Sequence, residues 1–166
     1  MENNNKKSYL NENIPTFSLT MLSSDKGTQN KKYTLDNGEI VKEAIANFYQ
    51  GSLEVKHFNS VSELDEFIDN LQSNQALTLG IPHRNGERLD SGRVTATSFN
   101  EAGAINRTKE YFKFGNTLLF DIDDSDLEID EVIPALIKID PNLANAALLV
   151  RTSSSYGVHI KGDTNA

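Results

Sequence analysis

Two short segments carry the side chains best suited to chemistry. The first is FDIDD at residues 120–124, in which Asp121 and Asp123 stand two positions apart. On an extended strand their carboxylates point to the same face, about 7 Å apart. Paired carboxylates at a strand end suit Mg²⁺ or Mn²⁺, which bind a few carboxylates together with substrate phosphates. The alternative is an acidic strand end that leads into a solvated helix start.

The second segment is TSSSYGVHI at residues 152–160, directly after an apolar run. Small hydroxyl residues and a glycine let the backbone approach a ligand, and hydroxyl and N–H groups suit phosphate oxygens. If the segment is extended, Ser155 and His159 lie on one face. His159 would then donate a hydrogen bond to a triphosphate or transfer a proton. The alternative is a structural histidine that is satisfied within a strand.

Other readings of the acidic segment fit less well. An EF-hand loop that starts at Asp121 needs glycine and glutamate where Asp126 and Val132 stand. Haloacid-dehalogenase-type phosphatases use Asp-x-Asp after an apolar strand but typically continue with Gly-Thr, whereas Asp124 and Ser125 follow here. Nucleotide-sugar transferases also use Asp-x-Asp, and nothing else in the sequence supports them.

Taken together, the two segments resemble motifs of the archaeo-eukaryotic primase superfamily, and more narrowly those of the primase-polymerase domains of plasmid and phage replication proteins. In that family an apolar strand with Asp-x-Asp is followed by a helix, a strand and a turn of the form Thr-Ser-Gly-Ser-x-Gly-x-His. Residues 120–123 match the first motif, and residues 152–159 match the second with Ser154 in place of a glycine. The upstream segments ALTLGIP and RTKEYFKF are also similar to the family.

The resemblance implies a metal-dependent nucleotidyltransferase that extends a nucleotide or primer end with nucleoside triphosphates on a single-stranded DNA template. Asp121 and Asp123 would be the metal ligands and, with His159, the catalytic residues. The contacts to the triphosphate would come from Ser153, Ser155, Gly157 and His159. From the adjacent segment, Arg107, Lys109 and Lys113 are candidates for contacts to backbone phosphates, with a solvated basic segment as the alternative.

The resemblance also implies a fold, which is an α+β domain with an RRM-like catalytic sheet. The family places a third acidic ligand on a later strand, and residues 160–166 do not match that motif. We therefore expect a flexible segment over 1–15 and an incomplete primase-polymerase-like domain over 16–166. Such a fragment of a longer replication protein would have little activity by itself. A helicase domain commonly follows in these proteins.

Two other functions remain open. A phosphatase would use Asp121 as the nucleophile and Asp123 as the acid/base. A non-catalytic module would bind nucleic acid or a protein partner without metal or nucleotide, which the net charge of −8 disfavours.

Composition sets the outer limits. The 166 residues are 37% hydrophobic and 24% charged, which is enough to bury the core of one domain. Seven acids lie within 121–131, so the rest of the chain nets only −1. The absence of cysteine excludes disulfides, thiolate nucleophiles and zinc sites that need sulfur. No apolar run has signal-peptide or membrane-spanning length, so we expect a cytoplasmic chain without a membrane partner.

Hydrophobic periodicity predicts the elements that hold these segments. Ser60 and Glu63 have capping-box spacing, and an apolar stripe follows, which predicts a helix of about three turns from residue 61. A second helix is predicted over 127–139, with Pro134 kinking it or delaying its start. The segment 39–49 is ambiguous between a helix and a strand, and the segment 82–98 is predicted to be loop-rich. Strands are predicted over 16–22, 32–35, 53–58, 117–122 and 145–151, with another beginning at residue 158. Residues 75–81 form a short apolar run that Pro82 breaks.

Overall fold

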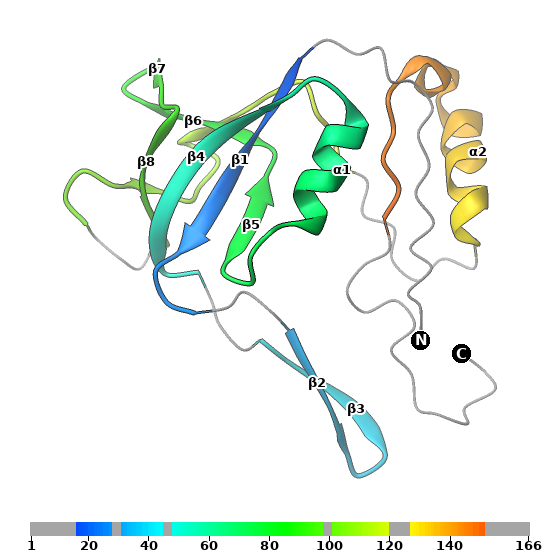
Figure 1. The fold of residues 1–166 in the computed structure, drawn as a ribbon, viewed down its shortest axis with the longest axis horizontal. Helices are drawn as coiled ribbons and strands as arrows, with labels where there is room; N and C mark the ends of the chain where they lie inside the picture. Colours follow the sequence, from blue (N-terminus) through cyan, green and yellow to red (C-terminus); the bar gives the residue numbers. More distant parts are fainter. Residues whose placement is uncertain (1–15, 28–30, 45–47, 98–100, 120–126, 152–166) are drawn as a thin grey trace. The chain divides into compact units, whose positions relative to one another are not determined.

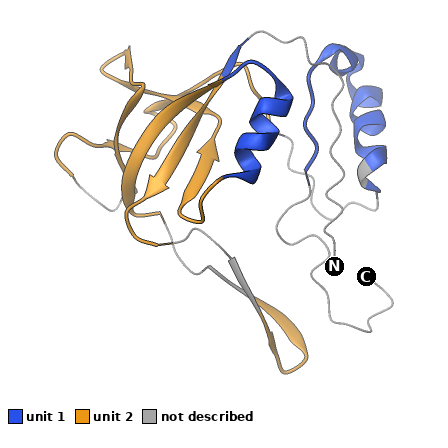
Figure 2. Ribbon diagram, viewed as in Figure 1, with its two compact units in different colours: residues 1–17, 58–70, 119–156 blue, residues 18–57, 71–118, 157–166 orange. Residues whose placement is uncertain are grey.

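The computed structural model describes residues 16–27, 31–44, 48–97, 101–119 and 127–151 (Figure 1). The chain divides into two compact units, coloured separately in Figure 2. Unit 1 comprises residues 1–17, 58–70 and 119–156, and unit 2 comprises residues 18–57, 71–118 and 157–166. The elements of the described residues are β1 (Phe17–Ser24), β2 (Lys31–Asp36), β3 (Glu39–Ala44), β4 (Gln50–Phe58), α1 (Val61–Asp69), β5 (Gln75–Thr78), β6 (Gly80–Arg84), β7 (Glu87–Arg88), β8 (Ser91–Thr95), β9 (Ile105–Asn106), β10 (Phe112–Phe114) and α2 (Ile129–Ile139).

Unit 2 is built on a five-stranded sheet with the order β5-β1-β4-β8-β9. The β1–β5 and β4–β8 pairs are antiparallel, whereas β8 and β9 are parallel, with Val94 opposite Ile105. The sheet is therefore mixed, and with the two helices the chain has the α+β class that the sequence predicts. The predicted strands over 16–22 and 53–58 are confirmed as β1 and β4.

The core of unit 2 lies on one face of this sheet. Along β4, buried Leu53 and Val55 alternate with exposed Ser52 and Glu54, as the two-residue period of a strand requires. Burying one apolar face in this way is the main source of stability for an antiparallel sheet. The buried cluster consists of Leu22, Phe48, Leu53, Val94 and Ile105.

The prediction of a loop-rich segment over 82–98 is wrong. A three-stranded sheet with the order β10-β6-β7 uses the first part of this segment, and β8 uses the last part. Periodicity missed these strands because they are short and only partly apolar: β7 has two exposed residues, and β8 buries only Val94 and Thr95. β6 also pairs with the distant strand β10, in which Lys113 lies opposite Ile81, and β8 pairs with β4. The pairing of β6 with β7 is a local hairpin across Asn85 and Gly86.

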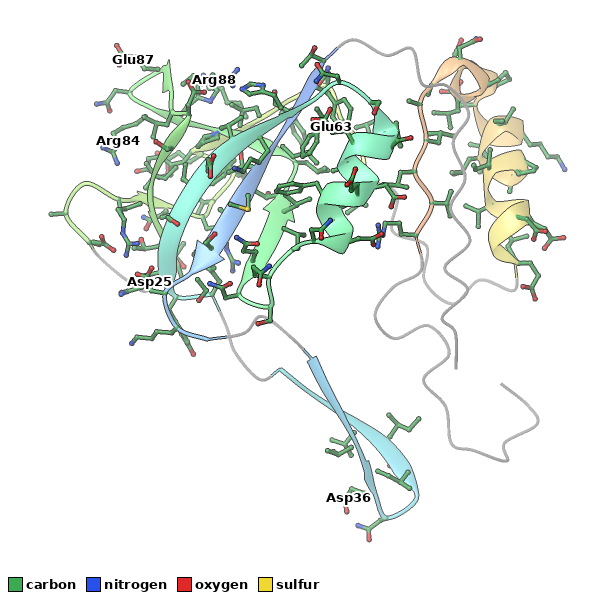
Figure 3. The ribbon with its side chains drawn as sticks, in the orientation of Figure 1. Asp25, Asp36, Glu63, Arg84, Glu87 and Arg88 are labelled. Carbon is green, nitrogen blue, oxygen red and sulfur yellow. The ribbon has the colours of Figure 1, made fainter. Side chains whose placement is uncertain are left out.

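The ambiguous segment after residue 38 is a strand. β2 and β3 form a two-stranded antiparallel sheet in which Leu35 pairs with Ile40. The turn between them places Asn37 and Gly38 at φ values of 48° and 86°. An Asn-Gly turn with both φ values positive matches the twist of a hairpin, so the predicted turn is confirmed. Asp36 lies at the tip of this hairpin (Figure 3).

Helix α1 in unit 1 begins as the capping pattern predicts. The Ser60 hydroxyl accepts a hydrogen bond from the Glu63 backbone N–H at 3.0 Å. The Glu63 carboxylate accepts from the backbone N–H of Asn59, at 2.7 Å. These bonds satisfy donors that a helix start leaves unpaired. Phe67 of the helix makes an edge-to-face contact with Phe58, which also contacts Phe17, so the apolar stripe of α1 packs on an aromatic cluster.

Two predicted strands are not formed in the described residues. Residues 117–119 are not in a strand, and Leu118 and Leu119 are 77% and 73% exposed. A 3-10 helix over Pro141–Asn145 occupies the start of the other segment, and residues 146–151 have no strand assignment. Apolar composition indicates a strand only where a second strand supplies the hydrogen-bond ladder. The intervening helix is confirmed as α2, with Pro134 inside it.

Candidate functional site

The structure describes only the chain around the two predicted motifs. Asp121, Asp123, Ser153, Ser155, Gly157 and His159 lie outside the described residues, and so does the strand predicted from residue 158. Their assignment therefore stays a prediction. Within the described ranges there is no group of three His, Asp or Glu side chains that could hold a metal ion.

The described chain between the motifs folds back on itself within unit 1. α2 runs in one direction, the 3-10 helix turns the chain, and residues 146–151 run back (Figure 1). The eleven residues of α2 rise about 16 Å at 1.5 Å per residue. Six extended residues span about 20 Å, which is enough to return over the full length of the helix.

Part of the acidic run serves the start of α2. The backbone N–H of Glu128 donates to the Glu131 carboxylate at 3.0 Å. Asp130 and Glu131 lie in the first turn, where negative charge is stabilised by the helix dipole. The run from 121 to 131 thus contains a helix-capping part, and a metal site would have to use the acids that precede residue 127.

Arg151 directly precedes residues 152–160, which we call the Ser/Gly-rich segment, and its side chain is bound by helix α1. Its Nη1 donates to Oδ1 of Asp65 and, at 3.3 Å, to the backbone carbonyl of the same residue. Its Nη2 donates to Oδ1 of Asp69 at 2.6 Å. One guanidinium therefore bridges two carboxylates that lie one helical turn apart.

Sequence reasoning missed this contact, although one signal was present. Asp65 lies four residues after Val61 on the apolar stripe of α1 and is only 3% exposed. A carboxylate is rarely buried unless it is paired, so an acid in an apolar stripe predicts a cationic partner. The sequence alone does not identify Arg151 as that partner, because 86 positions separate the two residues.

The three predicted nucleic-acid contacts lie in the described part of unit 2, and all are exposed. Arg107 follows β9, and its guanidinium carbon lies 5.3 Å from the ring centre of Phe48. Lys109 lies between β9 and β10, and Lys113 lies in β10. Among the described carboxylates, none forms an ion pair with any of the three. Their charges are thus available to neutralise phosphates, which is compatible with the predicted role.

The other arginines of this region are engaged in internal contacts. Arg84 and Arg88 come from β6 and β7 (Figure 3). Arg84 donates to the backbone carbonyl of Gly103, and Arg88 Nε donates to Asp90 at 2.8 Å. Arg93 bridges Asp25 and Glu101. Arg88 and Arg93 are thereby less suited to bind DNA than the three basic residues of 107–113.

A serine–histidine contact on unit 2 does not form a nucleophile and its base. Ser18 Oγ lies 2.8 Å from His57 Nδ1, and Arg88 Nη2 lies 3.3 Å from His57 Nε2. A guanidinium can only donate, so Nε2 accepts, and the ring proton of the neutral imidazole lies on Nδ1. His57 then donates to Ser18 and has no lone pair with which to remove its proton. A serine-hydrolase reading of this pair is therefore excluded.

The Arg93 bridge predicts a pH-dependent contribution to stability. Arg93 Nε donates to Glu101 at 2.8 Å and Nη1 donates to Asp25 at 3.1 Å. The hydrogen bond from Arg93 lowers the pKa of Asp25 below its usual 3.8, and these two acids raise that of Arg93. A carboxyl whose folded pKa is lowered stabilises the fold above its unfolded pKa. That stabilisation is lost as the pH falls through the folded value.

We expect Asp25→Asn to reduce the free energy of unfolding by about 1 kcal/mol at neutral pH. The difference from the unmodified chain should shrink as the pH falls through the folded pKa of Asp25. Urea unfolding of both proteins between about pH 6 and pH 2 measures this, because the folded pKa of Asp25 lies below its usual 3.8. Asp90→Asn removes a more exposed pair and is the control, for which we expect a smaller difference. A difference for Asp25→Asn that is constant with pH would contradict the prediction.

No described helix has the length and apolar character needed to cross a membrane. In comparisons with known proteins, no family model, curated protein or solved structure matches the chain.

Proposed function

We propose that this chain carries the first two motifs of a primase-polymerase-type nucleotidyltransferase with an RRM-like catalytic sheet. Its substrates are nucleoside triphosphates and a single-stranded DNA template, and its cofactor is Mg²⁺ or Mn²⁺. The reaction is primer synthesis in plasmid or phage replication, and it takes place in the cytoplasm. The replication protein also contains a helicase domain. The support comes from the two motifs in the sequence and from the course of the chain between them.

The observation that carries the proposal is the return of the chain over 127–151. The chain enters α2 at its N-terminal end. The extended segment after the 3-10 helix is long enough to bring the chain back to that same end. Asp123 is four residues before residue 127, and Ser155 is four residues after residue 151. Four residues span at most about 14 Å. Each motif is therefore tethered to one end of this helix and its return segment, which supports the proposal that both contact one triphosphate.

The distribution of charge also favours the proposal. Residues 71–118 hold six basic and four acidic side chains, whereas residues 119–151 hold eight acidic and two basic ones. A net positive segment suits template phosphates, and a strongly acidic one suits a divalent cation. The overall charge of −8 hides this separation.

The roles follow from the chemistry of the donors. The carboxylate oxygens of Asp121 and Asp123 are the ligand type that Mg²⁺ and Mn²⁺ prefer, so the donor set fits such an ion. A bound ion would neutralise charge on the triphosphate. The hydroxyl groups of Ser153 and Ser155, the backbone at Gly157 and the imidazole of His159 would donate hydrogen bonds to phosphate oxygens.

We expect His159→Ala to weaken binding of a nucleoside triphosphate by roughly tenfold, since a hydrogen bond to a charged group contributes about 1.5 kcal/mol. Fluorescence titration of a labelled deoxynucleoside triphosphate in the presence of Mn²⁺ measures this. His57→Ala removes an exposed histidine of unit 2 and should leave the affinity unchanged. Equal affinity in the His159→Ala variant and the unmodified chain would refute the role of His159.

The two alternatives give different results. A phosphatase would trap a beryllofluoride adduct on Asp121. A non-catalytic module would bind DNA without metal dependence and would have no affinity for the triphosphate.

A further inference from the structure

We propose that Arg151 is a positioning residue, which fixes the start of the Ser/Gly-rich segment to helix α1 and so determines the affinity for the triphosphate. This inference rests on the proposed function, because that function assigns the nucleotide contacts to Ser155 and His159. The contacts that carry it lie entirely in described residues of unit 1.

The first argument is the geometry of the bridge. Arg151 reaches Asp65 with Nη1 and Asp69 with Nη2, and each nitrogen has its own carboxylate. Two bonds from one planar group fix its orientation as well as its position, which a single point charge does not achieve. The bridge thereby tethers residue 151 to α1.

The second argument is burial. Asp65 is 3% exposed, and the side chain of Arg151 is 22% exposed. Ion pairs in solvent are weak because water screens them and the side chains lose rotamer freedom, whereas a buried, hydrogen-bonded pair persists. Asp69 is different, because its side chain is 47% exposed. Asp65 thus anchors the arginine, and Asp69 sets its angle.

The third argument is distance along the chain. Ser155 follows Arg151 by four residues and His159 follows it by eight, so they can lie no farther from it than about 14 Å and about 29 Å. Fixing the first residue of such a short segment reduces the conformational freedom that is lost when a ligand orders the rest. The bridge to α1 therefore acts on affinity without touching the ligand.

The test separates positioning from stability in the full 166-residue chain. Asp69→Ala removes the exposed arm of the bridge and leaves the buried arm, so the fold should persist. Arg151→Lys keeps the charge but cannot hold both carboxylates in a fixed plane. Val61→Ala is the matched control, because it weakens α1 through its buried apolar face without changing the bridge. For each variant, the melting temperature and the affinity for a labelled deoxynucleoside triphosphate with Mn²⁺ are measured.

We expect Asp69→Ala and Arg151→Lys to weaken the affinity by roughly fivefold to tenfold with little change in melting temperature. Val61→Ala should lower the melting temperature and leave the affinity of the folded chain unchanged. If both bridge variants bind as tightly as the unmodified chain while His159→Ala does not, the positioning role is wrong and the proposed function stands. If the unmodified chain does not bind the triphosphate, the proposed function itself fails.

Discussion

Replacing both Asp121 and Asp123 with Asn is expected to abolish Mn²⁺-dependent binding of a nucleoside triphosphate, with a loss of roughly 100-fold or more. An amide keeps the size of the side chain but removes the negative charge that attracts a divalent cation. Without the cation, the triphosphate would meet an acidic segment that repels it. Titration of the labelled triphosphate with and without Mn²⁺ measures the loss. In a replication protein that synthesises primers, the same change should eliminate synthesis.

The adjacent acids provide a matched control. Asp124→Asn with Asp126→Asn changes the net charge by the same amount in the same segment, but it leaves the Asp-x-Asp pair intact. We expect this control to bind the triphosphate nearly as well as the unmodified chain. An equal loss in both double variants would mean that only the overall charge matters, and the assignment of Asp121 and Asp123 as ligands would be rejected.

Replacing Gly51 with Ala is expected to destabilise unit 2 by about 3 kcal/mol or more, which is a large part of the stability of a typical domain. Gly51 lies in β4, where the strand passes close to β1. A Cβ atom at this position would lie 2.0 Å from the backbone oxygen of Ser23 and 3.0 Å from Cζ of Phe48. The oxygen belongs to the main chain, so no side-chain rotation relieves the overlap, and the strands would have to separate.

Thermal unfolding measures this effect, and a shift of roughly 6 to 12 °C corresponds to 3 kcal/mol for a chain of this size. Gly92→Ala is the control, because Gly92 lies in the neighbouring strand β8 and has open space where its Cβ would be. We expect its melting temperature to be unchanged or slightly raised. Equal melting temperatures for the Gly51→Ala variant and the unmodified chain would show that β1 and β4 do not approach as closely as the structure has them.

The sequence predicts those parts of the fold that depend on neighbouring residues. The start of α1 follows from Ser60 and Glu63, and the hairpin turn follows from Asn37 and Gly38. β8 was missed because its partner β4 lies about 40 residues earlier, and β7 was missed because it is two exposed residues long. The segments 117–119 and 146–151 were predicted as strands from their apolar residues, but a strand also needs a neighbour that the pattern does not supply.

Some parts of the candidate site were likewise predicted from the sequence, and one part was not. The sequence predicts its two motifs through a resemblance, and they stay predictions because they lie outside the described residues. The sequence also predicts exposed basic residues over 107–113, and the structure describes all three as exposed. The support that helix α1 gives to Arg151 was not predicted, since an ion pair between residues so far apart leaves no periodic signal. The local sequence indicated this contact only through Asp65, an acid within the apolar stripe of α1.

The Arg151–Asp65 bridge also constrains the order in which the chain can fold during its synthesis. Helix α1 leaves the ribosome 86 residues before its arginine. At a synthesis rate of about 5 to 20 residues per second, Arg151 is made roughly 4 to 17 seconds after α1. During this interval Asp65 lacks the guanidinium of Arg151, so the state of α1 that includes this bridge cannot be reached early. The sheet of unit 2, whose described strands all precede residue 115, can form first. Unit 1 is thus expected to fold late, and its folding is complete only when the carboxylate of Asp65 is buried against Arg151.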